Sequence, residues 1–136
     1  MKYMRDGNVI VARLFKGEEF IESVKMLCRK ENFSSGRVQA IGAVQKAVLG
    51  YFDVEEKKYI HFEYKGELVS CMGNISQKNG DVVVHAHAVI SDRHGDCRGG
   101  HIVMAEASAT IELFIDVRLN LKRARDTETD LYLLDL

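Results

Sequence analysis

The sequence predicts an α+β fold, in which a mostly antiparallel β-sheet, open or barrel-like, packs against one main α-helix. Two patterns carry this prediction. One stretch near the N-terminus has apolar residues at helical spacing, whereas from about residue 38 onward apolar and polar residues alternate. The length of 136 residues, with 46% hydrophobic and 29% charged residues, suits a single domain over residues 1–136.

The first predicted elements are a strand and the helix. Val9 to Phe15 is a short apolar run that fits a strand buried on both faces. A helix is expected after Gly17, with acidic residues in its first turn and basic residues in its last, as the helix dipole favours, and an end near Asn32. Its apolar stripe consists of Phe20, Ile21, Val24, Leu27 and Cys28.

The remaining chain is predicted to form strands separated by polar turns. The alternation covers residues 38–45, 47–53, 59–64, 67–76, 82–90, 101–104 and 107–119. Asn79-Gly80 is typical of a type I′ hairpin turn, which would pair Lys78 with Asp81. The polar, glycine-rich stretch from Asp92 to Gly100 is interpreted as a flexible connection. The apolar tail, residues 131–136, is expected to pair or pack because it would otherwise aggregate.

Three histidines form a candidate metal site. His85 and His87 project from the same face of a strand, with Cα atoms about 6.6–6.8 Å apart, so their rings can converge on one ion. His101 follows Gly99-Gly100, where a backbone without side chains can fold back over the pair. Three neutral imidazoles suit a divalent ion, above all zinc, and leave a fourth position for water or substrate. Hydrogen-bonded structural histidines are the open alternative.

Further polar residues have candidate roles around this site. The hairpin register places Asn74 opposite His85, where its amide either orients a ligating ring or is an ordinary strand-end group. Glu106 and Asp92 are candidate general bases for a metal-activated water, although surface carboxylates are more common. His61 and His94 are interpreted as solvated.

Composition argues against several classes of protein. The net charge of −1 offers no basic excess for DNA. Three distant cysteines without a C-x-x-C pair argue against a disulfide framework and for a reducing, cytoplasmic location. No signal-peptide core or membrane-spanning run is found, so a membrane is not expected as a partner. The basic cluster Lys122-Arg123-Ala124-Arg125 is interpreted as a solvated, charge-balanced face because acidic residues follow it.

Several segments, in this order and spacing, resemble the plant-and-prokaryote-conserved (PPC) domain. Cys71 and Ile102 stand where leucine is expected, which affects packing rather than chemistry. The segments that carry the resemblance are Ala40-Ile41-Gly42-Ala43-Val44, Leu49-Gly50-Tyr51-Phe52-Asp53, Gly66-Glu67-Leu68-Val69-Ser70, Gly73-Asn74-Ile75-Ser76, His85-Ala86-His87-Ala88-Val89 and Gly99-Gly100-His101-Ile102.

The resemblance implies a compact antiparallel sheet with a helix on one side, assembled as a homotrimer. In plants this domain follows AT-hooks in nuclear proteins, whereas prokaryotic members stand alone and are described as candidate DNA-binding proteins. The AT-hook core Arg-Gly-Arg-Pro cannot occur here, because the chain has no proline.

Two functions stay open from the sequence. One is a homotrimeric, metal-binding module for binding or regulation, with an unidentified protein or DNA partner. The other is a metal-dependent enzyme that acts on an unidentified small molecule.

Overall fold

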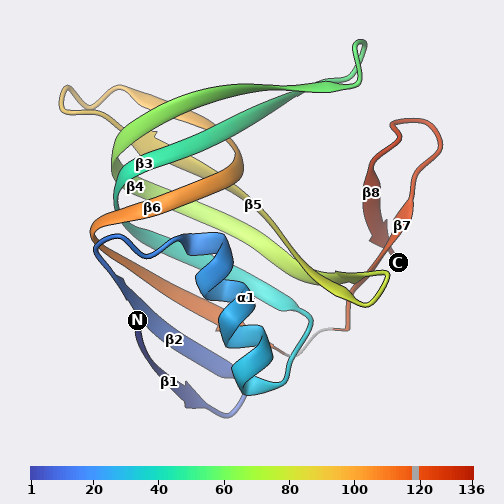
Figure 1. The fold of residues 1–136 in the computed structure, drawn as a ribbon, viewed down its shortest axis with the longest axis horizontal. Coiled ribbons are helices and arrows are strands. Elements are labelled where there is room, and N and C mark those ends of the chain that lie inside the picture. Colours follow the sequence, from blue (N-terminus) through green and yellow to red (C-terminus); the bar gives the residue numbers. More distant parts are fainter. Residues whose placement is uncertain (118–119) are drawn as a thin grey trace.

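The computed structural model describes residues 1–117 and 120–136. Within them the chain forms one helix and eight strands, and the α+β prediction is confirmed (Figure 1). The elements are β1 (Lys2–Asp6), β2 (Val9–Phe15), α1 (Phe20–Glu31), β3 (Gly36–Asp53), β4 (Lys58–Lys78), β5 (Asp81–Ser91), β6 (Cys97–Asp116), β7 (Lys122–Arg125) and β8 (Tyr132–Asp135).

Four long strands form the centre of the sheet and pair in a cycle. β3 pairs with β4 and β6, and β5 pairs with the same two strands, all antiparallel. β1 and β2 extend the sheet from β6, and β7 and β8 extend it from β4, on the opposite side of the ring in Figure 1. The sheet is therefore ring-like rather than a closed barrel.

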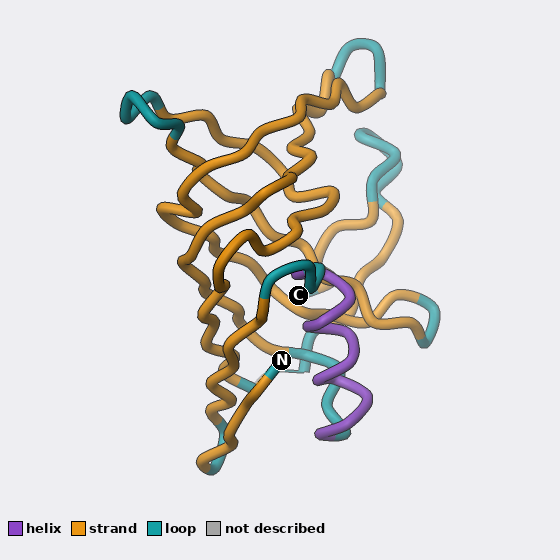
Figure 2. The backbone as a smooth tube through the Cα atoms, turned by 60° about the vertical axis from the view of Figure 1, so that its left-hand side comes forward, coloured by secondary structure: helices purple, strands orange, loops and turns teal. Residues whose placement is uncertain are grey.

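The helix covers one side of the sheet and begins three residues later than Gly17. The carboxylate of Glu19 caps it by accepting a hydrogen bond of 2.7 Å from the backbone N–H of Glu22. It ends at Asn32, as predicted, where the backbone is left-handed with φ of 53°. Figure 2 shows the helix lying beside the strands. In the described residues, no helix is long and apolar enough to cross a membrane.

The core lies between the helix and the inner face of the sheet. Apolar side chains from the helix and from five of the strands are withdrawn from water there, which supplies the main driving force for folding. The largest fully buried side chains include Ile10, Leu14, Phe20, Leu27, Leu49, Leu68, Ile75, Ile111, Leu113 and Ile115.

β2 has its predicted bounds but was wrongly predicted to be buried on both faces, because its buried and exposed residues alternate. The other strands that were predicted are longer than expected. Residues 38–45 and 47–53 belong to one strand, β3, and residues 59–64 and 67–76 to β4. Irregularities in the register of β3, between Ala40 and Gly42 and between Val44 and Ala47, interrupt the alternation that the prediction relied on. The strand segments predicted at 101–104 and 107–119 likewise form β6, whose described end is Asp116, whereas Leu119 lies outside the described residues.

The turns and the tail were predicted with mixed success. Asn79 and Gly80 both have positive φ, 52° and 90°, and Lys78 pairs with Asp81, so the hairpin is confirmed. The connection after β5 is shorter than predicted, because residues 97–100 pair with β5 as the start of β6. The tail pairs as β8 with β7, as expected, whereas β1 and β7 were not predicted.

Candidate metal centre

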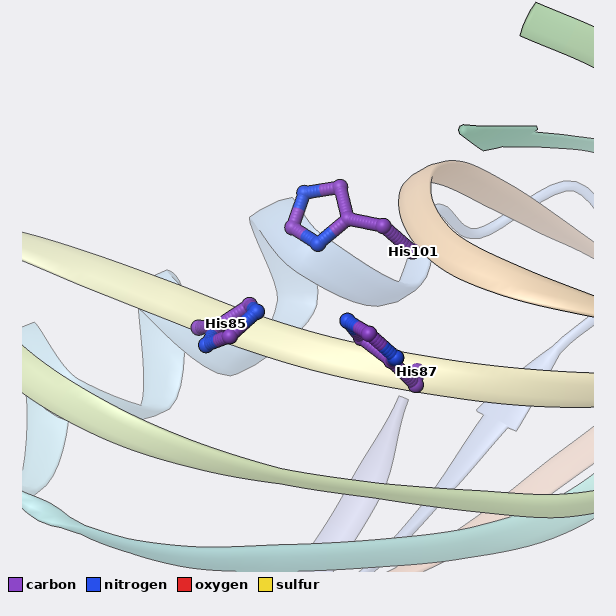
Figure 3. A group of neighbouring side chains, drawn as sticks. All are labelled: His85, His87 and His101. Carbon is purple, nitrogen blue, oxygen red and sulfur yellow. The ribbon is translucent and has the colours of Figure 1, made fainter. Parts of the chain in front are cut away.

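Two neighbouring strands bring the three histidines together. In β5 the even-numbered residues such as Ala86 and Ala88 point into the core, so His85 and His87 project from the other face. β6 runs antiparallel beside them and sets His101 directly opposite His87. One ligand atom from each ring lies within 4.8 Å of the others, and Figure 3 shows the three rings gathered around a common space.

The distances fit one ion after a small adjustment. The ring centroids are 5.2 Å apart for His85 and His87, 5.1 Å for His85 and His101, and 5.5 Å for His87 and His101. Zinc–nitrogen bonds of about 2.0–2.1 Å in a tetrahedral site bring donor nitrogens to about 3.3 Å from one another. The donor atoms, which lie within 4.8 Å of one another, would therefore move closer together on binding one ion.

The chemistry of the rings also fits a metal ion. Nδ1 of His101 is buried and has no hydrogen-bond partner, which is costly unless some other group satisfies the nitrogen. Burial lowers the pKa of His101 to about 4, with repulsion from His85, His87 and Arg123 adding to the effect. Burial also lowers the pKa of His85. Neutral rings are the form that binds metal.

A glycine allows the strand of His101 to come close. An added Cβ at Gly100 would lie 2.9 Å from the backbone oxygen of Gly50 on β3, a distance that real Cβ atoms essentially never show. A residue with a side chain would push β6 away from β3 at the position next to His101. This close approach is to β3, whereas the glycine pair was expected to let the backbone fold back over His85 and His87 on β5.

Aromatic residues surround the cluster. The ring of Tyr59, on β4, packs against His101 with centroids 5.4 Å apart and stacks on His61 at 6.1 Å. His61 is exposed, as predicted, and so is His94 in the turn after β5. Tyr59 was missed because nothing in its own strand pattern marks it as a neighbour of His101.

Asn74 lies opposite His85, as the hairpin register predicted. Its side-chain oxygen accepts a hydrogen bond of 2.8 Å from Nη2 of Arg123. The amide oxygen that was expected to orient a histidine ring therefore has an arginine as its partner. The basic cluster around Arg123 was interpreted as solvated, which holds for Lys122 and Arg125 but is wrong for the half-buried Arg123.

Neither candidate base belongs to the histidine cluster: Glu106 lies farther along β6 and Asp92 lies in a turn. The carboxylate of Glu106 accepts a hydrogen bond from the side-chain amide of Gln45. Asp92 closes the turn between β5 and β6, where its Oδ1 accepts hydrogen bonds from the backbone N–H groups of His94 and Asp96 at 2.8 and 3.1 Å. In the described part of the chain, the side chains grouped at the candidate metal centre are the three histidines alone.

A pocket opens beside the cluster. It has a volume of about 340 Å³ and lies between β5 and the hairpin of β7 and β8. His85 and His101 form part of its wall, together with Tyr59, Arg123 and Tyr132. The candidate metal centre therefore adjoins a space large enough for a small molecule.

Comparison with known proteins identifies the family. The model of the Plants and Prokaryotes Conserved (PCC) domain matches residues 1–117. This chain belongs to that family. PCC and PPC are two abbreviations of the same family name, so the resemblance to the PPC domain is confirmed. Among curated protein sequences, none matches the chain.

Solved structures of PPC-like proteins share the whole fold. A plant- and prokaryote-conserved protein from Pyrococcus horikoshii is 30% identical, with 99% of this chain and 94% of that one covered and a TM-score of 0.85. A metal-containing protein from Archaeoglobus fulgidus is 28% identical over 100% and 99% of the two chains, with a TM-score of 0.86. A candidate DNA-binding protein from Ralstonia eutropha is 26% identical over 99% and 96%, with a TM-score of 0.93.

Proposed function

We propose that this PPC domain is a binding module that holds one divalent ion, zinc, between His85, His87 and His101. The observation that carries the proposal is the unpartnered, buried Nδ1 of His101 within a group of three converging rings. Imidazole donors suit zinc, which would leave one coordination position open toward the pocket. The similarity to a metal-containing protein supports the same conclusion.

We further propose that the module is a homotrimer. Large apolar side chains are exposed on the outer face of the sheet: Met4 is 64%, Phe114 54% and Met72 55% exposed. Pairing between strands sets these three residues in one row across the sheet, with Val11 and Gln39 between them, and His87 is the next member after Met72. Such a row of apolar side chains marks an interaction surface, and a closed ring of copies would cover it.

We also propose a partner, a cellular location and domain bounds for the module, each from a separate observation. Relatives named as candidate DNA-binding proteins support an association with DNA, but the near-zero net charge limits its strength. A protein partner is the other possibility that the module form allows. The free thiols of Cys28, Cys71 and Cys97 support a reducing compartment, the cytoplasm. We infer that residues 1–136 act as one domain.

Metal analysis of purified protein tests the central proposal. The wild type, loaded with zinc and dialysed, should hold one ion per chain, and the His85→Ala/His87→Ala variant should hold none. His94→Ala removes an exposed histidine from a turn and serves as the matched control, with full metal content expected. Equal, low zinc content in all three proteins would refute the metal site.

A metal-dependent enzyme is the second candidate, and the pocket beside the histidines is the observation that favours it. A bound zinc ion lowers the pKa of a coordinated water and so supplies a nucleophile. Glu106 and Asp92 stay predictions as bases. Zinc-dependent hydrolysis of 4-nitrophenyl acetate, lost in Glu106→Gln or Asp92→Asn at unchanged zinc content, would favour an enzyme over a module. No turnover above the zinc-free protein would leave the module as the better account.

A further inference from the structure

The pocket beside the histidines is built from four parts of the chain, of which β4 contributes Tyr59 and Lys78. β5 contributes His85 and Val83, β6 contributes His101, and the segment from Arg123 to Leu133 closes the other side. This last segment lies beyond the residues that match the family model, which end at 117. The wall that faces the candidate metal centre is therefore the part of the chain that the family pattern does not describe.

Arg123 is the most unusual group in this wall. Its side chain donates to three neutral acceptors: the hydroxyl of Ser76 at 2.8 Å, Oδ1 of Asn74 at 2.8 Å and the backbone oxygen of Tyr132 at 2.6 Å. Ser76 is fully buried and Arg123 is half-buried. Among the described residues, none of the ion pairs includes Arg123. A partly desolvated guanidinium is thus fixed in place without a carboxylate to balance its charge.

The other charges around the pocket do not supply that balance. Lys78 adds a second positive charge, and its Nζ lies 3.5 Å from the centre of the Tyr132 ring. Asp130 is the acidic residue of the wall, but its carboxylate pairs with Arg125 at 2.5 Å. The pocket is therefore positively charged at the end where Arg123 and the histidines meet, and an anion is the complementary ligand.

The rest of the pocket is apolar. Val83, Leu131 and Leu133 line it together with the ring of Tyr132. The volume of about 340 Å³ lies at the small end of the range for ligand sites. A matching molecule has one oxyanion group and a compact apolar body.

The hairpin that carries Arg123 is anchored at both ends. The hydroxyl of Ser35 accepts from the backbone N–H of Leu121 at 2.9 Å, and the backbone N–H of Gln77 donates to the oxygen of Leu121 at 2.9 Å. At the far end, Nζ of Lys57 donates to the backbone oxygen of Glu128 at 3.2 Å, which ties the hairpin to the turn between β3 and β4. Figure 1 shows these two hairpins on the same side of the molecule. The wall is thus held in position before a ligand arrives.

We propose that this pocket binds a small organic anion, a carboxylate or a phosphate with an apolar body, whose oxyanion pairs with Arg123 beside the three histidines. The inference rests on the proposed metal site, because the same oxyanion would take the coordination position that faces the pocket. Asn74 and Ser76 are positioning residues in this account, since they hold the guanidinium and are not among the residues that line the pocket.

Calorimetric titration of the zinc-loaded protein tests the proposal. Benzoate and phenyl phosphate are the two anionic probes, and benzamide is the neutral control of the same size. At least one of the two anions should bind, and benzamide should not. The anion that binds more tightly shows whether the pocket prefers a carboxylate or a phosphate. Arg123→Gln should weaken the binding at least about tenfold, as expected for a lost hydrogen bond to a charged group. Lys122→Gln removes the same charge from the exposed face of the same strand and should leave affinity unchanged.

A second pair of variants keeps the test valid if Arg123→Gln loosens the hairpin. Leu133 is exposed at the pocket wall, so Leu133→Glu places a negative charge there without disturbing the core and should also weaken the anion. Leu136→Glu adds the same charge at the 99% exposed terminus and should have no effect. Zinc content is measured for every variant. Full zinc with no anion binding, or binding insensitive to both Arg123→Gln and Leu133→Glu, overturns this inference alone, whereas absence of zinc overturns the proposed function.

Discussion

His87 lies directly opposite His101 across the β5–β6 pair, with their ring centroids 5.5 Å apart. Opposite residues in an antiparallel pair have Cβ atoms about 4.5–5.5 Å apart, so the register alone brings two donor rings together. His85, two residues along the same face, adds the third ring. The candidate metal centre is therefore built from regular sheet geometry, on strands whose other faces lie in the core.

Zinc should stabilise the folded protein. An ion that binds the native state at a concentration of 100 times its Kd adds about 2.7 kcal/mol to the free energy of unfolding. Urea unfolding of the zinc-loaded protein and of protein treated with EDTA measures this difference. His101→Gln should abolish the difference, and His94→Gln, in the exposed turn, should retain it. The same unfolding curve with and without zinc for the wild type would contradict the prediction.

Gly100→Ala should weaken zinc binding more than it weakens the fold. The new methyl group would meet the backbone oxygen of Gly50 at 2.9 Å, so β6 must shift next to His101. Overpacking of this kind costs about 1–3 kcal/mol, and the shift that relieves it falls on the backbone beside His101. Competition with a zinc-sensitive dye measures the affinity for zinc. Ser70→Ala, at an exposed position of β4, is the control and should leave this affinity unchanged. An unchanged affinity for Gly100→Ala would show that the close approach does not position His101.

The histidine cluster was predictable because its geometry is local. His85 and His87 share a face by alternation, and the β5–β6 hairpin needs only a short turn to return His101 to them. Arg123 was not predictable in the same way. Its partners Asn74 and Ser76 lie 49 and 47 residues earlier in the chain, so no window of sequence contains the contact.

The fold was predicted better than its strand boundaries. Helix α1 and the type I′ turn at Asn79-Gly80 follow from local preferences, and both are confirmed. The ring of β3, β4, β5 and β6 depends on pairing between distant strands, including β3 with β6, and alternation within one strand carries no information about its partner. Single strands such as β3 were predicted as two shorter strands, because bulges interrupt the alternation of period two.

Binding to duplex DNA should be weak and sensitive to salt. The chain has 19 Lys and Arg residues against 20 Asp and Glu, so few phosphates can be neutralised. We expect a Kd of about 1 μM or weaker at physiological salt, the range of non-specific binding. Fluorescence anisotropy with an AT-rich and a GC-rich duplex, each at two salt concentrations, measures it. Sub-micromolar affinity at physiological salt for either duplex would contradict the expectation.

The protein should sediment as a trimer with three times the chain mass of 15.4 kDa. The outer row of Met4, Phe114 and Met72 is the surface expected to be buried between copies. Met72→Lys and Phe114→Lys each place a charge in that surface and should shift the mass toward the monomer, since a buried unpaired charge costs several kcal/mol.

The control for association replaces another exposed methionine outside this row. Met26 is 39% exposed on helix α1, so Met26→Lys makes the same chemical change on the side of the molecule that the helix covers, and it should leave the trimer intact. Sedimentation equilibrium at micromolar concentration distinguishes the outcomes. A monomeric wild type would refute association, and a dimer would keep association but contradict three-fold assembly. A trimer that resists both substitutions in the row would place the contact on another face of the sheet.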